Sequence, residues 1–167
     1  MTELVETYRG AIYPWHCDHM GHMNVMWYVG KFDEATWNLF ATMGITAAFL
    51  KENRRGMAAV RQEISYRREL YAGETVAVRS AFLEVRDKVA KFVHEMRNAV
   101  SGELAATCVL TGVHIDAQTR KSCAFPADIL ERGRSLVREV HEEIEPEAAP
   151  MHAGQGAAEE AADGPAV

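Results

Sequence analysis

The sequence lacks several features that would place it in a specialised class of protein. No apolar run approaches the roughly 18–20 residues that a membrane-spanning helix needs. The first ten residues, MTELVETYRG, have neither the basic segment nor the apolar core of a secretory signal, so a cytoplasmic protein is expected. The cysteines Cys17, Cys108 and Cys123 show no CxxC spacing, which argues against a disulfide framework and an ordinary zinc ribbon.

An excess of basic charge is also missing. The formal net charge is −6, but seven acids and no Lys or Arg follow residue 140, which leaves 17 acids and 18 bases in residues 1–140. This near-neutral part shows no clustered basic face of the kind that binds nucleic acid. No nucleic-acid or membrane partner is therefore expected, whereas local arginine and lysine clusters suit a small anionic ligand.

The length of 167 residues fits one domain, and the composition of 48% hydrophobic and 25% charged residues is that of a globular protein. The last segment, EPEAAPMHAGQGAAEEAADGPAV, contains almost no large apolar residues. Such a segment cannot bury enough surface to offset the entropy of ordering it. We therefore expect a folded domain over residues 1–144 and a disordered acidic tail over residues 145–167.

One long helix is predicted from Val25 to about Met43. Asn24 is a suitable N-cap and Gly44 a suitable residue to follow the helix end. Apolar and small residues recur at spacings of three and four and form one wide stripe. The stripe consists of Met26, Val29, Phe32, Thr36, Leu39, Phe40 and Met43.

The remaining segments show the period-two alternation of strands. A short strand precedes Pro14, and four longer strands follow the helix, the third of the five showing a slip in alternation near 81–83 that indicates a bulge. The predicted ranges are 7–13, 57–70, 75–85, 90–96 and 103–115, with a last helix over about 127–140. In the strand predicted over 57–70, Val60 is expected on the buried face. In the strand predicted over 90–96, His94 is expected to be a buried core histidine. This order predicts an α+β fold in which a five-stranded antiparallel sheet wraps around one long central helix, with a C-terminal helix added.

The residues that indicate chemistry lie in the stretch WHCDHMGHMNVMWYVGKFDEA, residues 15–35. Asp18 stands just before a glycine turn and the start of the long helix. The first N–H groups of a helix have no intrahelical acceptor and lie at the positive end of the helix dipole, so they can stabilise an oxyanion. A carboxylate beside such a helix end is what ester or thioester hydrolysis requires.

At these positions the sequence resembles the hotdog-fold acyl-CoA thioesterases of the 4-hydroxybenzoyl-CoA thioesterase-like group. The resemblance extends over about residues 5–130, and Val25 stands where many relatives carry a second asparagine. It rests on the motif Asp18-x-x-Gly21-His22-x-Asn24, followed by Tyr28, Phe32, Glu34 and Ala35.

The resemblance implies that Asp18 is the catalytic carboxylate, either as a nucleophile that forms a mixed anhydride or as a general base on water. It also implies that the N–H near Val25 holds the thioester oxygen. Oxyanion and substrate positioning then fall to Gly21, His22, Asn24, Val25 and Tyr28. Members of the family are at least dimers, so a homodimer or a dimer of dimers with the site at the subunit interface is expected. Coenzyme A enters as part of the substrate, and no other cofactor is implied.

The phosphates of a CoA substrate need cationic partners. Arg67, Arg68 and Lys88, near strand ends or turns, are the candidates, although each also suits a solvated charge. An acyl pocket is expected from Trp15, Trp27, Trp37, Phe49 and the methionines, and its depth and acyl preference stay open. An aromatic cage for a quaternary ammonium acyl group is a less favoured form of such a pocket.

The same stretch has other interpretations. Asp18 could simply cap its turn, Tyr28 could be a core residue, and His22 is expected to fix the loop rather than to transfer a proton. A zinc site at His16, Cys17, His19 and His22 would lack a second ligand pair, so no metal is expected. A hotdog hydratase is disfavoured because Asp18-x3-His22 misses the Asp-x4-His spacing by one residue. A non-catalytic acyl-thioester-binding module is the remaining alternative.

Overall fold

The computed structural model describes residues 4–139, so the end of the predicted domain at residue 144 and the predicted tail 145–167 lie outside the described residues. Within 4–139, no helix combines the length and the apolar character that a bilayer crossing requires. Five strands form one antiparallel sheet in the order β1-β3-β4-β5-β2. The elements are β1 (Val5–Ala11), a 3-10 turn (Pro14–His16), α1 (Val25–Met43), α2 (Ala47–Asn53), β2 (Arg55–Tyr66), β3 (Thr75–Arg86), β4 (Val89–Asn98), β5 (Leu104–Asp116) and α3 (Ala127–Ser135).

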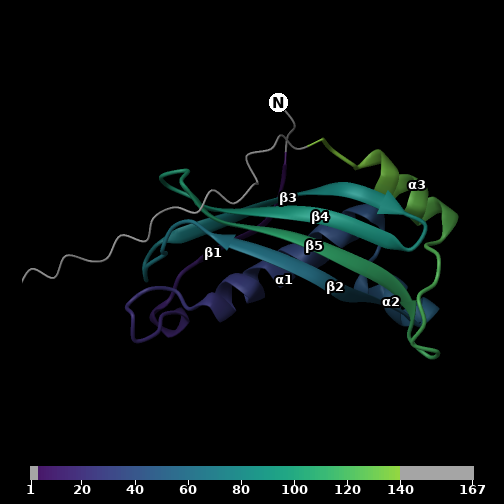
Figure 1. Ribbon diagram of the computed structural model, residues 1–167, viewed down its shortest axis with the longest axis horizontal. Coiled ribbons are helices and arrows are strands. Elements are labelled where there is room, and N and C mark those ends of the chain that lie inside the picture. The colour runs from purple at the N-terminus through teal and green to yellow at the C-terminus, as the bar shows by residue number, and fades with distance from the viewer. Residues whose placement is uncertain (1–3, 140–167) are drawn as a thin grey trace, which may run out of the picture.

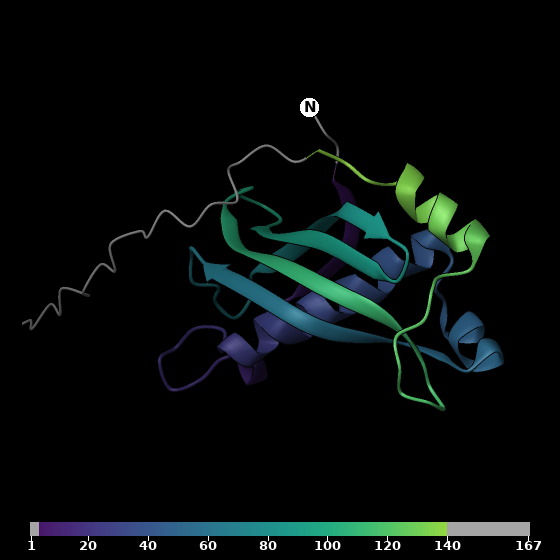
Figure 2. The same ribbon diagram turned by 45° about the vertical axis from the view of Figure 1, so that its right-hand side comes forward.

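The sheet curves around α1, which lies along its concave side, while α2 and α3 lie toward the end of the molecule where α1 finishes (Figures 1 and 2). The predicted α+β architecture of a five-stranded antiparallel sheet around one long helix is therefore confirmed. Strand boundaries differ by a few residues from the prediction, α3 ends earlier than expected, and the short helix α2 was not predicted.

The boundaries of α1 agree with the prediction. The Asn24 side chain accepts a hydrogen bond from the Met26 N–H, and Gly44 adopts φ 101°, the left-handed conformation that favours glycine at a helix end. The predicted stripe is partly wrong, because Met26 and Val29 are 62% and 40% exposed. The buried face instead turns toward the sheet through Tyr28, Lys31, Phe32, Ala35, Thr36, Leu39, Phe40 and Met43. Met26 and Val29 thus lie beside the buried face and stay partly exposed.

Strand β2 forms one edge of the sheet and, among the described residues, pairs only with β5. Its predicted alternation fails at Val60, which is 62% exposed. The register shifts between Ala59 and Arg61, so Val60 sits in an irregularity and no longer follows the pleat. The bulge predicted near 81–83 is confirmed by a register shift between Phe82 and Glu84 in β3.

A chain of buried polar side chains in the core is centred on His94 of β4. The His94 Nε2 lies 2.9 Å from Thr36 Oγ1, and its Nδ1 lies 2.5 Å from Ser80 Oγ, which in turn lies 2.6 Å from Thr7 Oγ1. Because the Thr36 hydroxyl donates to the Phe32 carbonyl, it accepts from His94, so the imidazole carries a proton on Nε2. The prediction of a satisfied core histidine is confirmed, since His94 is fully buried.

Burial lowers the pKa of His94 to about 3. In the unfolded chain a histidine takes up its proton near pH 6.5, so between that pH and about pH 3 the unfolded state holds one more proton than the folded state. The free energy of unfolding should therefore fall by about 1.4 kcal/mol per pH unit on acidification through this window from His94 alone. In urea unfolding at several pH values, His94→Gln should lower the number of protons taken up on unfolding in this window by about one. An unchanged slope of the unfolding free energy against pH would contradict the assignment.

Candidate active site

The segment between β1 and α1 folds into a small hairpin with Asp18 near its base. Cys17 and Met23 pair across it, the Asp18 N–H donates to the His22 carbonyl at 3.2 Å, and the Gly21 N–H donates to the Asp18 carbonyl at 3.0 Å. Gly21 has φ 85°, a conformation that side chains with a Cβ rarely adopt. The hairpin therefore needs a glycine at this position, and it delivers the chain directly into α1.

The Asp18 carboxylate is held by two hydrogen bonds. Its Oδ2 accepts from Asn24 Nδ2 at 2.6 Å, and its Oδ1 accepts from the Met20 N–H at 2.8 Å. These two donors, Asn24 first, lower the pKa of Asp18 below the ordinary value of an aspartic acid. Asp18 is thus ionised at neutral pH and fixed in orientation.

Asn24 connects this carboxylate to the helix start. Its Oδ1 accepts from the Met26 N–H at 3.0 Å, while its Nδ2 donates to Asp18. Val25 is the first residue of α1, so its N–H has no intrahelical acceptor, and no hydrogen bond from it to any atom of residues 4–139 is found. A free amide at the positive end of a 19-residue helix and an ionised carboxylate are therefore held together by one side chain.

The segment after β2 anchors the hairpin. The Met23 N–H donates to the Leu70 carbonyl at 2.7 Å, and the Tyr28 hydroxyl donates to the Arg68 carbonyl at 3.0 Å. Burial raises the pKa of Tyr28, which keeps this donor neutral. His22 lies 3.5 Å from a Glu69 carboxylate oxygen and 3.4 Å from the Met23 carbonyl, contacts that suit the expected loop-fixing role.

The three candidate CoA-binding residues do not lie together. Arg67 and Arg68 follow β2 beside the hairpin, where Arg68 forms an exposed ion pair with Glu103 at 2.9 Å. Lys88 lies in the turn between β3 and β4, at the other end of β3 from the hairpin. Eleven residue steps of β3, at about 3.3 Å each, separate the two ends by roughly 36 Å. Of the three, only the two arginines lie in the segment that anchors the hairpin.

The residues that suggested a zinc site, His16, Cys17, His19 and His22, do not form a metal-binding cluster. Among residues 4–139, no three His, Cys, Asp or Glu side chains are placed to hold one metal ion. His16 is buried, and its Nδ1 accepts a hydrogen bond from the Tyr13 N–H at 3.0 Å. This bond occupies one of the nitrogen atoms that a metal ion would need.

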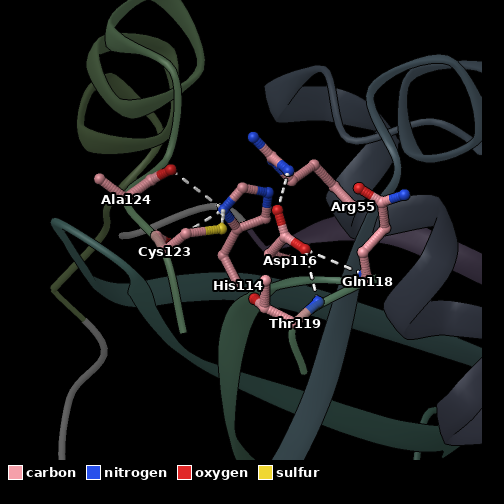
Figure 3. A network of polar contacts seen from close by, with 7 residues as sticks. All are labelled: Arg55, His114, Asp116, Gln118, Thr119, Cys123 and Ala124. Carbon is pink, nitrogen blue, oxygen red and sulfur yellow. Dashed lines mark hydrogen bonds and ion pairs between the residues drawn. The ribbon is translucent and has the colours of Figure 1, made fainter. Parts of the chain in front are cut away.

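A second polar network lies at the Lys88 end of the sheet (Figure 3). The His114 Nδ1 contacts the Cys123 and Ala124 carbonyls at 3.0 and 3.1 Å, and Arg55 forms an ion pair with Asp116 at 2.7 Å. These contacts fasten the connection between β5 and α3. They are far from Asp18 along the strands and belong to the scaffold.

A cavity of about 200 Å³ lies between α1 and the strands β2 and β5. Val29, Gly30, Asp33 and Trp37 contribute the helix side, and Met57 and Gly112 are among the residues of the strand side. Asp18 does not line this cavity. Val29 is the first residue of α1 that lines the cavity, and it is one turn beyond Val25. The cavity therefore begins close to the free amide at the helix start.

Comparison with known proteins identifies the family. The family model of the thioesterase-like superfamily matches residues 12–133 of the chain. The chain belongs to the thioesterase-like superfamily. The match includes the hairpin, α1 and all of β2 to β5, so the fold and the predicted family are confirmed together.

Two curated relatives of this thioesterase-like chain carry related names. One is the L-carnitine dehydrogenase/betainyl-CoA thioesterase of Rhizobium meliloti, 26% identical over 139 residues. The chain spans 28% of that protein, and the aligned part covers 83% of the chain. The other is the betainyl-CoA thioesterase of Pseudomonas aeruginosa, 24% identical over 136 residues, which cover 81% of the chain and 86% of the relative.

A solved structure shows the same fold. It is a hypothetical protein from Staphylococcus aureus in complex with CoA, with a TM-score of 0.77 and 18% identity. The similarity covers 88% of this chain and 92% of that protein.

Asn24 should have two separable roles. Asn24→Ser keeps a capping oxygen but loses the amide donor to Asp18, whereas Asn24→Ala loses both and should cost about 1 kcal/mol of stability. In both variants the pKa of Asp18 should rise toward its ordinary value, because the donor that favours the ionised form is gone. Carboxyl carbon NMR titration reports the pKa directly, and thermal unfolding reports the cap. A wild-type titration in Asn24→Ser would contradict the assigned bond.

Proposed function

We propose that this protein is an acyl-CoA thioesterase in which Asp18 is the catalytic carboxylate. The observation that carries the proposal is the ionised Asp18, bound by Asn24, beside the free Val25 amide at the start of α1. Membership of the thioesterase-like superfamily, two relatives named as betainyl-CoA thioesterases and a similar structure bound to CoA support it.

In the proposed reaction, the thioester oxygen accepts a hydrogen bond from the Val25 N–H, which stabilises the negative charge that develops on it. Asp18 attacks the carbonyl carbon, and CoA leaves as the thiolate. Water then cleaves the mixed anhydride, which releases the acid and restores the carboxylate. In the alternative route, Asp18 acts as a general base and removes a proton from the water that attacks the carbonyl carbon. The lowered pKa keeps Asp18 ionised for either route, since it reduces basicity and nucleophilicity together.

The substrate phosphates are proposed to contact Arg67 and Arg68, which lie on the hairpin side of the sheet. Gly21, His22, Asn24 and Tyr28 are proposed to hold the loop geometry and to contact substrate only indirectly. Tyr28 illustrates this, since its hydroxyl already donates to the Arg68 carbonyl.

Replacing the carboxylate should abolish the activity without unfolding the protein. Asp18→Asn is nearly isosteric and should lower kcat by at least about 100-fold, because the nucleophile is lost. Thiol release from a panel of saturated acyl-CoAs measures the effect, with Asp128→Asn on α3 as the matched control.

The panel also separates the alternatives. Retained activity in Asp18→Asn would overturn the assignment. Hydration of crotonyl-CoA without thiol release would indicate a hydratase. Binding without turnover in the wild-type protein would indicate a non-catalytic module.

A homodimer or a dimer of dimers is proposed to complete the site. The long edge of β2 is unpaired within the described residues, and Val60 on it is exposed together with Val25, Met26, Val29 and Trp37 of α1. An unpaired edge beside apolar side chains favours association with a second sheet.

Light scattering coupled to size-exclusion chromatography should therefore give twice the chain mass of 18.6 kDa or a higher multiple. Val60→Glu should dissociate the assembly, because it buries an unpaired charge in the interface. Val100→Glu, in the exposed turn between β4 and β5, is the matched control and should leave the mass unchanged. A monomeric wild-type protein would contradict the proposal.

A further inference from the structure

The cavity between α1 and the strands β2 and β5 contains a negative charge without a counter-ion. Asp33 is the one charged residue among those that line it. No hydrogen bond or ion pair to the Asp33 carboxylate is found among residues 4–139. Asp33 is exposed to solvent, and its carboxylate attracts a cation that occupies the cavity beside it.

The same cavity presents aromatic rings. Trp37 is 42% exposed and packs edge-on against Phe40, with ring centroids 6.0 Å apart. Phe40 packs edge-on against Phe92 at 5.1 Å, and all three rings line the cavity. The faces of such rings attract cations, most strongly for tryptophan, and are the usual partners of quaternary ammonium groups.

One side of α1 leads from the proposed position of the thioester carbonyl, at the Val25 N–H, to this cavity. Val25, Val29, Asp33 and Trp37 follow one another at spacings of four and therefore lie along one side of the helix. Asp33 is eight residues beyond Val25, a rise of about 12 Å at 1.5 Å per residue, and helical side chains lean back toward the N-terminus. An acyl group whose carbonyl is bound at the Val25 N–H and which extends along this side would bring its far end toward Asp33.

We propose that Asp33 and Trp37 select acyl groups that end in a quaternary ammonium. The carboxylate supplies the opposite charge and the indole supplies a cation–π face, while the apolar wall accommodates the methyl groups. The inference rests on the proposed thioesterase function. It assigns the acyl selectivity to two residues that take no part in the chemical step. The same carboxylate repels acyl groups that carry a negative charge.

The test compares cationic substrates with neutral ones of the same shape. Trimethylammonioacetyl-CoA pairs with 3,3-dimethylbutyryl-CoA, and 4-trimethylammoniobutyryl-CoA pairs with 5,5-dimethylhexanoyl-CoA. Within each pair a nitrogen replaces a carbon, so the ratio of the two kcat/KM values isolates the effect of charge. For at least one pair, the wild-type ratio should favour the cation by about tenfold or more.

Asp33→Asn should lower this ratio by about tenfold, while kcat/KM for the neutral partner stays within about threefold of wild type. Trp37→Leu should lower the ratio as well, through loss of the cation–π face. Asp87→Asn, which removes an exposed acid in the turn between β3 and β4, is the matched control and should leave the ratio unchanged. A purely structural role of Asp33 would lower both members of a pair equally.

The outcomes separate this inference from the proposed function. A wild-type ratio near one for both pairs, or a ratio that Asp33→Asn leaves unchanged, would overturn the assignment of Asp33 and Trp37. Hydrolysis of the neutral substrates that still requires Asp18 would then leave the thioesterase proposal standing. Activity that is independent of Asp18 would instead remove the proposed function itself.

Discussion

The side-chain amide of Asn24 is the interaction on which the candidate site depends. Its oxygen caps α1 by accepting from the Met26 N–H, and its nitrogen donates to the Asp18 carboxylate. One planar group therefore fixes both the direction of the helix start and the position of the acid beside it. The bond from the Asn24 nitrogen, together with the bond from the Met20 N–H, also lowers the pKa of Asp18 and keeps it ionised. The scaffold around this amide serves to hold the hairpin and the helix in place.

That scaffold is attached at a few identifiable points. The backbone of residues 68–70 receives hydrogen bonds from Met23 and Tyr28, which ties the hairpin to the segment after β2. The buried His94 chain links α1 to β3 and β4 through Thr36 and Ser80. The first set positions the hairpin and the second positions the middle of the helix. Together they determine where the cavity beside Asp33 lies relative to the free amide.

Much of this architecture could be predicted from the sequence because the responsible signals are local. The cap at Asn24, the glycine after the helix and the alternating strands each depend on neighbouring residues, and the structure reproduces them. The errors have a non-local cause. Met26 and Val29 belong to the periodic stripe, but the sheet covers only the adjoining face of α1, and Val60 is displaced by a register shift on an edge strand. The bond between Asn24 and Asp18 and the isolation of Asp33 were also beyond sequence reasoning, since both depend on how chain segments meet in three dimensions.

Asp18 and Val25 are close in the sequence, and this affects where insertions and additional domains can be added to the molecule. The acid and the amide are held mainly by contacts within one hairpin and its junction with α1. The opposite end, with α2, α3 and the His114 network, contributes no bond to them. Insertions or additional domains joined at that distal end would leave the acid–amide pair undisturbed. A module with this layout is well suited to gene fusion, and one relative's name indeed couples a dehydrogenase with a thioesterase in a single longer polypeptide.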